Sequence, residues 1–293
     1  MLIFLSGLAA AALAAWLACR LPLKKQNLLL NLLAALFPLS EIWKQLLLTW
    51  ANGGVYRWWY FPFQLCSMPL YLLPMRQLLA LCLLQSHALR LRQSHALRLR
   101  QSLALRLRRV PLLSWLSSVL TDFLADFGLL AGLFAFADQT GMRYPLPALT
   151  LHSYLWHFAM IFLGLFLILS GRHSRSSSAA RQGSAYAPGQ PLSRSRRAAH
   201  GNGGEKVRKS SGFLPAAILF LILAGIAELL NFLLRGKGSI DMFYISPWEP
   251  STQVVLRDIA ARLGRGPEIL LYLGLILLGA GLIHLCAAAF RRS

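Results

Sequence analysis

Long apolar runs separated by short polar connections dominate the chain. A helix that crosses a bilayer needs about 20 consecutive, mostly apolar residues. Seven runs approach or exceed this length, and we predict that each forms a transmembrane helix: residues 2–19, 28–50, 63–84, 112–137, 149–170, 213–234 and 268–290. The pattern predicts an all-α, polytopic transmembrane helix bundle that forms a single domain over residues 1–293.

Composition and charge sharpen this picture. Charged residues make up 14% of the chain, whereas soluble domains carry about 25%, so a water-soluble globular protein is excluded. The net charge is +20, and 21 of the 30 Lys and Arg residues follow the first, third and fifth predicted spans or form the C-terminal tail. The positive-inside rule places those segments in the cytoplasm. We therefore predict a multi-pass plasma-membrane protein with its N-terminus outside and its C-terminus inside.

Two segments of low complexity lie on the predicted cytoplasmic side. Residues 85–109 contain three octapeptides, QSHALRLR, QSHALRLR and QSLALRLR. Eight helical residues rotate the pattern by about 80° per repeat, so no fixed apolar stripe results. We predict a cytoplasmic insertion there and a disordered basic loop over residues 171–211. Their Arg residues are expected to attract anionic lipid headgroups rather than a specific nucleic acid.

Ionisable groups inside a bilayer are costly, and they usually face the bundle interior or a water-filled cavity. By depth along the predicted spans, several polar side chains collect in the outer half of the membrane, close to Cys66. The expected cavity-lining residues are Gln64, Glu41, Asp126, His152, Trp156, Glu228, Asp241 and Tyr244. No Cys/His cluster has the spacing of zinc ligands, so we predict neither a metal nor a cofactor, and the oligomeric state is left open.

The segment IDMFYISPWEPSTQ, residues 240–253, combines aromatic residues, two prolines and acidic residues. Trp and Tyr favour the membrane–water interface, which is consistent with a simple interfacial anchor. Irregular backbone at membrane depth is tolerated where it lines a cavity, which is consistent with a re-entrant lid. The sequence leaves both interpretations open.

Three motifs resemble the YwaF-like family of bacterial integral membrane proteins. They are FPFQLCSMPLYLLP at 61–74, TLHSYLWHFAMIFLG at 150–164 and NFLL…IDMFYISPWEPSTQ at 231–253, and the resemblance covers the second to seventh spans. A related eukaryotic branch is regarded as an ether-phospholipid acyltransferase, so the resemblance implies acyl transfer with Cys66 as nucleophile and His157 as its catalytic partner. The family often has Asn where this chain has Asp241.

The resemblance implies a specific chemistry. His157 would deprotonate Cys66, because the thiolate is the nucleophile, and Cys66 would take an acyl chain from a phospholipid and pass it to a lysolipid. Asn231, or a backbone N–H near the start of the third span, would stabilise the oxyanion, and Asp126 or Glu41 would orient the histidine. The alternative is a non-enzymatic transporter or a lipid-binding membrane protein that uses the buried acidic residues.

Overall fold

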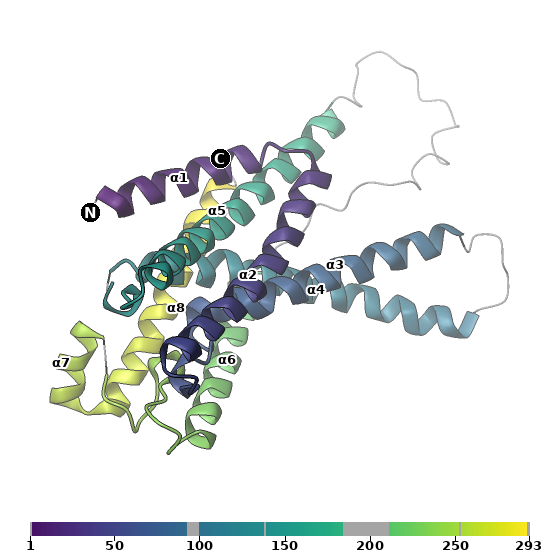
Figure 1. Ribbon diagram of the computed structural model, residues 1–293. Helices are drawn as coiled ribbons and strands as arrows, with labels where there is room; N and C mark the ends of the chain where they lie inside the picture. The colour runs from purple at the N-terminus through teal and green to yellow at the C-terminus, as the bar shows by residue number, and fades with distance from the viewer. Residues whose placement is uncertain (1, 93–99, 138, 184–210, 252, 292–293) are drawn as a thin grey trace, which may run out of the picture.

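The structure is a computed structural model that describes residues 2–92, 100–137, 139–183, 211–251 and 253–291. Figure 1 shows eight α-helices joined by loops and short 3-10 turns, and no strand occurs in these ranges. The helices are α1 (Leu2–Ala18), α2 (Leu23–Ala51), α3 (Met68–Arg92), α4 (Arg100–Phe134), α5 (Pro147–Gly183), α6 (Phe213–Leu233), α7 (Val254–Leu263) and α8 (Arg265–Phe290). The predicted all-α class is confirmed.

Within the described ranges, six helical stretches are long and apolar enough to cross a membrane. They are Leu23–Ala51, Leu65–Leu83, Pro111–Phe134, Pro147–Gly171, Phe213–Leu233 and Arg265–Phe290. The first predicted span corresponds to α1, an apolar helix of 17 residues that packs against α5. The chain is therefore a polytopic helical membrane protein, while its orientation remains a prediction from the distribution of Lys and Arg.

Helix α4 is the centre of the bundle. It contacts α3, α5, α6 and α8, and most of its apolar stretch is buried. Its Phe123 and Phe127 stack on each other, and Phe127 stacks on Phe220 of α6 with a centroid distance of 5.0 Å. By contrast, α2, α6 and α8 expose many leucines. Outward leucines suit a lipid environment because acyl chains are as apolar as they are.

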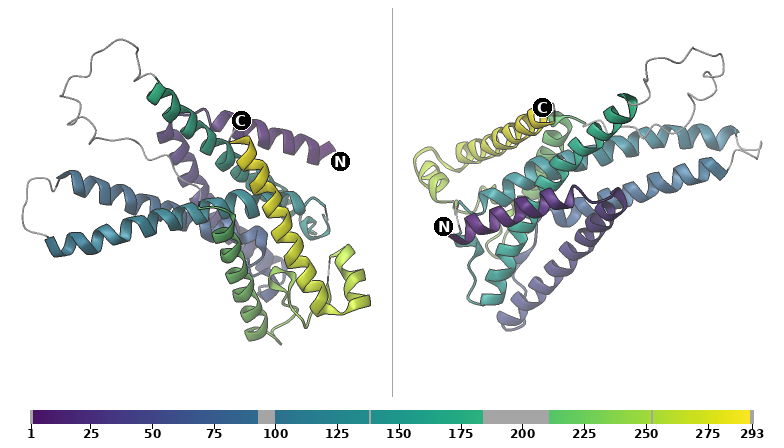
Figure 2. Two further views of the ribbon diagram at one scale, coloured as in Figure 1. Left: turned by 180° about the vertical axis from the view of Figure 1, so that it is seen from behind. Right: turned by 90° about the horizontal axis from the view of Figure 1, so that it is seen from above.

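Two helix boundaries differ from the sequence predictions. Helix α3 continues to Arg92 and α4 begins at Arg100, so the predicted insertion at 85–109 is helical on both sides of residues 93–99, which lie outside the described ranges. The two helices extend together beyond the bundle in both views of Figure 2. Helix α5 continues to Gly183, so residues 171–183 of the predicted loop are helical; residues 184–210 lie outside the described ranges.

Candidate functional site

Cys66 lies in a 3-10 turn, Leu65–Ser67, that leads directly into α3. The indole N–H of Trp156 on α5 donates a hydrogen bond of 3.0 Å to the backbone carbonyl of Cys66. The same indole packs edge-on against Phe37 of α2, with ring centroids 4.8 Å apart. Trp156 therefore joins the start of α3 to the facing sides of α2 and α5.

His157 is turned away from this contact. Its Nδ1 donates to the carbonyl of Ser153 on its own helix at 2.7 Å, and its ring meets Phe136 at the end of α4 edge-on. Successive helical residues are rotated by about 100°, so a helix that points Trp156 at Cys66 must point His157 elsewhere. Among the described contacts, none joins the imidazole of His157 to Cys66. The catalytic pair implied by the family resemblance stays a prediction.

The charged groups that act on Cys66 come from α2. Lys44 and Glu41 exert the electrostatic effects on its thiol, and the two are themselves an ion pair of 2.9 Å. Gln45 donates to the Glu41 carboxylate at 2.6 Å. Glu41 is only 4% exposed, so its charge is held by the ammonium and amide donors around it.

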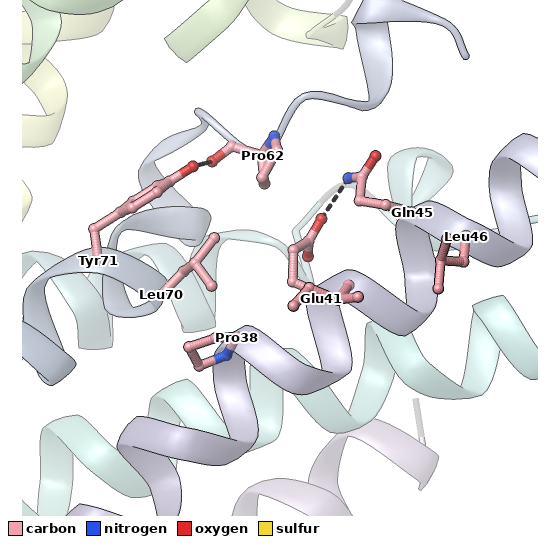
Figure 3. A pocket seen from close by; sticks show the side chains of 8 residues that line it. Pro38, Glu41, Gln45, Leu46, Pro62, Leu70 and Tyr71 are labelled. Atoms are coloured by element: carbon pink, nitrogen blue, oxygen red, sulfur yellow. Dashed lines mark hydrogen bonds between the residues drawn. The ribbon is translucent and has the colours of Figure 1, made fainter.

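A groove of about 420 Å³ opens between α2 and the start of α3, and Figure 3 shows the side chains that line it: Pro38, Glu41, Ile42, Gln45, Leu46, Pro62, Leu70 and Tyr71. Ile42 and Leu46 are exposed on the outer surface of α2, so the groove faces the space that lipid occupies. Glu41 and Gln45 bring polar atoms to its wall. Leu70 follows Cys66 by four residues, which places the groove beside the cysteine.

His152 packs between two tryptophans. Its ring centroid lies 5.6 Å from that of Trp43 on α2 and 5.7 Å from that of Trp156. Since Trp156 also binds Cys66, the structure brings His152, Trp156 and Cys66 into one aromatic region between α2, α3 and α5. Sequence depth placed these three residues in the outer half of the membrane, but it did not predict that Trp156 would be the residue in contact with Cys66.

Asn231 has a different role from the predicted oxyanion donor. Its side-chain oxygen accepts the backbone N–H of Met242 at 2.7 Å, and its amide donates to the Met242 carbonyl at 3.2 Å. The amide also lies 3.4 Å from Glu228. Because both ends of the amide hold the backbone after α6, Asn231 fixes this turn, and the described contacts do not direct it toward Cys66.

The turn that Asn231 holds has an unusual backbone. Phe243 and Tyr244 have φ values of 58° and 60°, a conformation that non-glycine residues rarely adopt and that costs about 1–3 kcal/mol each. Phe243 is fully buried at 0% exposure, against Phe63 and Phe220. Residues 240–246 are thus packed into the protein. Trp248, which follows, is exposed in the manner of an interfacial residue.

Asp241 connects this turn to α3 and α8. Its backbone carbonyl accepts the side-chain amide of Gln64 at 2.8 Å, and its carboxylate accepts the N–H of Ser246 at 2.8 Å. Arg265 lies 3.4 Å from the carboxylate and also pairs with Glu268. Burial raises the pKa of Asp241 to about 6 despite the hydrogen bond from Ser246 and the charge of Arg265. The network holds two carboxylates and one guanidinium, so it carries an excess negative charge when Asp241 ionises.

Asp126 does not join the residues around Cys66. Its carboxylate binds Nδ1 of His284 on α8 at 2.7 Å, and Asp126 is only 1% exposed. Asp122, one turn earlier on α4, accepts the backbone N–H and the hydroxyl of Ser211 before α6. The α4 carboxylates therefore hold α6 and α8, and the structure gives no support to Asp126 as a lining residue of the cavity near Cys66.

Two side chains that join helices, Arg76 and His284, were not singled out by sequence reasoning. Arg76 donates to Thr121 of α4 at 2.9 Å and to its neighbour Gln77, which in turn donates to Asn31 of α2. His284 forms the pair with Asp126 described above. Arg76 is the ninth residue of the apolar helix α3, and this position was a signal that it is buried, but its partners on other helices have no sequence signature.

Comparison of the chain with known proteins finds no match: no family model, no curated protein and no solved structure matches it. Within the described ranges, no group of three or more His, Cys, Asp or Glu residues could hold a metal ion. The functional argument therefore depends on the groove and on the polar residues beside it.

Proposed function

We propose that this protein binds a membrane lipid in the groove between α2 and α3. The observation that carries the proposal is a lipid-facing groove with apolar walls from Ile42, Leu46 and Leu70 and a buried carboxylate, Glu41, in its wall. Binding sites for small amphiphiles combine such walls with a few fixed polar groups. An acyl chain occupies the apolar part, and the polar end of the lipid lies toward Glu41 and Gln45.

Pro38 supports the shape of this site. Proline has no backbone N–H, so it cannot complete the helix hydrogen bond to the residue four positions earlier, and it commonly bends a helix. It lies within α2 and lines the groove. A bend at this point leaves room beside α3 that a straight, closely packed helix pair would fill.

Native mass spectrometry tests lipid binding directly. Protein released from membranes is expected to retain a lipid adduct, and Leu46→Trp is expected to remove it by filling the groove. Leu32→Trp is the matched control, because Leu32 is 59% exposed on the same helix, Leu46 is 67% exposed, and only Leu46 lines the groove. Equal lipid retention by the two variants would contradict the proposed site.

Acyl transfer through Cys66 is the second candidate function. It is favoured by one relationship: Leu70, which lines the groove, follows Cys66 by four residues, so the groove lies beside the thiol. In the first step the Cys66 thiolate attacks the ester carbon of a phospholipid, a carbon–sulfur bond forms, and the ester carbon–oxygen bond breaks. The released alkoxide takes up the proton that the thiol lost. A lysolipid hydroxyl then attacks the thioester, the carbon–sulfur bond breaks, and the hydroxyl proton returns to the thiolate.

The structure does not single out the proton acceptor in this scheme. His157, which the family resemblance implies, is bonded to Ser153 and packed on Phe136. A phospholipid with an alkyne-labelled acyl chain is expected to label wild type through a hydroxylamine-sensitive bond and to spare Cys66→Ala, while Cys82→Ala labels normally. Labelling that is absent from wild type would overturn acyl transfer and leave lipid binding untouched.

A further inference from the structure

The chain between α6 and α8 lies at one surface of the membrane. The apolar stretch of α6 ends at Leu233 and that of α8 begins at Arg265, so residues 234–264 connect two spans at their common end, as Figure 1 shows. Arg235 and Lys237 follow Leu233 by two and four residues. Because the headgroup layer on each side of a bilayer is about 5–7 Å deep, both charges lie at the level of the lipid headgroups.

The charges of Arg235 and Lys237 are not matched within the described part of the chain. Two arginines further along form ion pairs, Arg257 with Asp258 and Arg265 with Asp241 and Glu268. Arg235 and Lys237 are exposed, and among the described residues no carboxylate, Glu249 included, forms an ion pair with either of them. Their charges are therefore available to a ligand from outside the chain.

Two aromatic rings hold the guanidinium of Arg235. Its central carbon lies 5.6 Å from the ring centroid of Phe232 at the end of α6 and 5.3 Å from that of Trp248. The two rings lie 6.0 Å apart, and both are exposed. A cation–π contact leaves the N–H groups of a guanidinium available as donors. Exposed aromatic rings favour the membrane–water interface, so the pair holds Arg235 at that depth.

The backbone around Lys237 is open to an approaching group. Gly236 and Gly238 have φ values of 90° and 116°, which glycine adopts readily because it has no Cβ. Apart from the chain neighbours, no described residue lies within 4 Å of the position that a Cβ would take on either glycine. A headgroup can therefore reach this segment without displacing a side chain.

We infer that Arg235, together with Lys237, binds the phosphate of an anionic phospholipid headgroup at this membrane surface. A guanidinium presents parallel N–H donors that match two phosphate oxygens. Two cations within three residues favour a headgroup with a net negative charge over one whose phosphate is balanced by an ammonium group. The site lies on different elements from the groove between α2 and α3 and does not depend on the function proposed for that groove.

Site-resolved photo-crosslinking tests the inference. Wild-type protein in nanodiscs is offered phosphatidylglycerol or phosphatidylcholine with a diazirine close to the glycerol, and modified peptides that cover residues 232–250 are quantified. We expect about fivefold higher apparent affinity for phosphatidylglycerol, the factor that one basic residue contributes at a membrane surface. Modification of the Arg-rich segments at 85–109 and 171–211 is the internal reference. Equal modification of residues 232–250 by the two lipids would overturn the inference.

A pair of variants separates this site from the general positive charge of the protein. Arg235→Gln is expected to lower the phosphatidylglycerol modification of residues 232–250 about fivefold. Arg262→Gln is the control, because Arg262 is exposed on α7, in the same connection, and is not part of the aromatic contact. Equal losses in the two variants would overturn the site. If Arg235→Gln does not fold, the lipid preference of wild type still decides the inference.

Trp248 is a positioning residue for Arg235. Trp248→Leu is expected to lower the modification, and Trp248→Phe is expected to restore most of it, since a ring then remains beside the guanidinium. Equal modification of Trp248→Leu and wild type would overturn the positioning role.

A soluble competitor distinguishes a lipid headgroup from a free phosphate ester. Glycerol 3-phosphate at millimolar concentration is expected to leave the modification of residues 232–250 unchanged, because it lacks the acyl chains that hold a headgroup at the membrane surface. Displacement by glycerol 3-phosphate would overturn the assignment to a lipid. Leu46→Trp, which fills the groove between α2 and α3, should leave this modification intact, so the two sites are tested separately.

Discussion

The indole N–H of Trp156 and the carbonyl oxygen of Cys66 are joined by a hydrogen bond of 3.0 Å. This contact fixes the start of α3 against α5 and determines which face of α5 is presented to the cysteine. It also explains why His157, the next residue, packs toward α4 instead. The environment of Cys66 is thus set by a tryptophan, a histidine stacked on that tryptophan and the ion pair on α2.

Trp156→Phe tests the importance of this bond for the fold. The substitution keeps an aromatic ring beside Phe37 but leaves the carbonyl of Cys66 without its donor, so we expect a loss of about 1–3 kcal/mol of unfolding free energy. Denaturant unfolding in detergent micelles measures this loss. Trp43→Phe is a suitable control, since Trp43 is exposed and stacks on the same His152 without bonding to the α3 start. Equal losses in the two variants would contradict the account.

Asn231→Leu is expected to release the turn after α6. The substitution removes two hydrogen bonds to Met242, and the buried N–H and carbonyl of that residue then lack partners, at a cost of about 1–3 kcal/mol each. The strained backbone at Phe243 and Tyr244 depends on such external support. Limited proteolysis should therefore cut within residues 240–251 much faster than in wild type. An unchanged cleavage rate would mean that the hydrogen bonds between Asn231 and Met242 are not needed to hold this turn.

The pKa of Asp241 predicts a pH dependence of stability. Burial raises this pKa to about 6, above the ordinary value of about 3.9 for an unfolded Asp. The Asp241 carboxyl group therefore binds its proton more tightly in the folded protein than in the unfolded chain. Its contribution to the free energy of unfolding is complete below about pH 4 and is lost as the pH rises through about 6. The size of the effect is on the order of 2–3 kcal/mol. Asp241→Asn should weaken this dependence of the unfolding free energy on pH.

Thermal unfolding at pH 5 and pH 8 measures this effect. We expect wild type to lose more stability between the two values than Asp241→Asn does. The pKa of Asp241 also responds to the charges of Arg265, Glu249 and Glu268. The control is therefore a carboxylate outside this network: Asp258→Asn, because Asp258 is exposed and pairs with Arg257. Wild type and Asp241→Asn with identical pH profiles would show that Asp241 keeps an ordinary pKa.

Asp126 and His284 should behave as a structural pair. Removing one partner of this hydrogen bond leaves the other without its donor or acceptor, at a cost of about 1–3 kcal/mol, so Asp126→Ala and His284→Ala are each expected to destabilise the protein. The double variant should cost less than the sum of the two single ones, as a double-mutant cycle of unfolding free energies measures. Additive losses would show that the two side chains do not interact. Lipid binding in the groove should survive in any of these variants that folds.

The sequence predicted the all-helical architecture well because apolar length is a strong signal in membrane proteins. It also placed Glu41, Trp156 and Cys66 in the outer half of the membrane, since their depths follow from counting residues along each span. The depth of a residue in the membrane does not, however, tell which way its side chain faces around the helix axis. Whether Trp156 or His157 faces Cys66 depends on how α5 is turned about its axis, and that is set by packing with α4 and α1.

Other features were beyond sequence reasoning for similar reasons. Asp126 was expected beside the outer cavity, but its carboxylate contacts His284 on α8. Asn231 was expected to serve an oxyanion, but the loop after α6 folds back onto it. The groove itself depends on how Pro38 and Leu46 of α2 come together with Pro62 and Leu70. Tertiary partners of this kind have no local pattern in the chain.

Photo-crosslinking tests the central claim, that a lipid occupies the groove between α2 and α3, most directly. A fatty alcohol with a diazirine in its chain should modify peptides that contain residues 38–46 and 62–71 of wild-type protein in nanodiscs, as peptide mass spectrometry reads out. Leu46→Trp should remove these modifications, while Leu32→Trp should leave them. Modification spread evenly over the exposed faces of α2, α6 and α8, and unchanged by Leu46→Trp, would contradict the account.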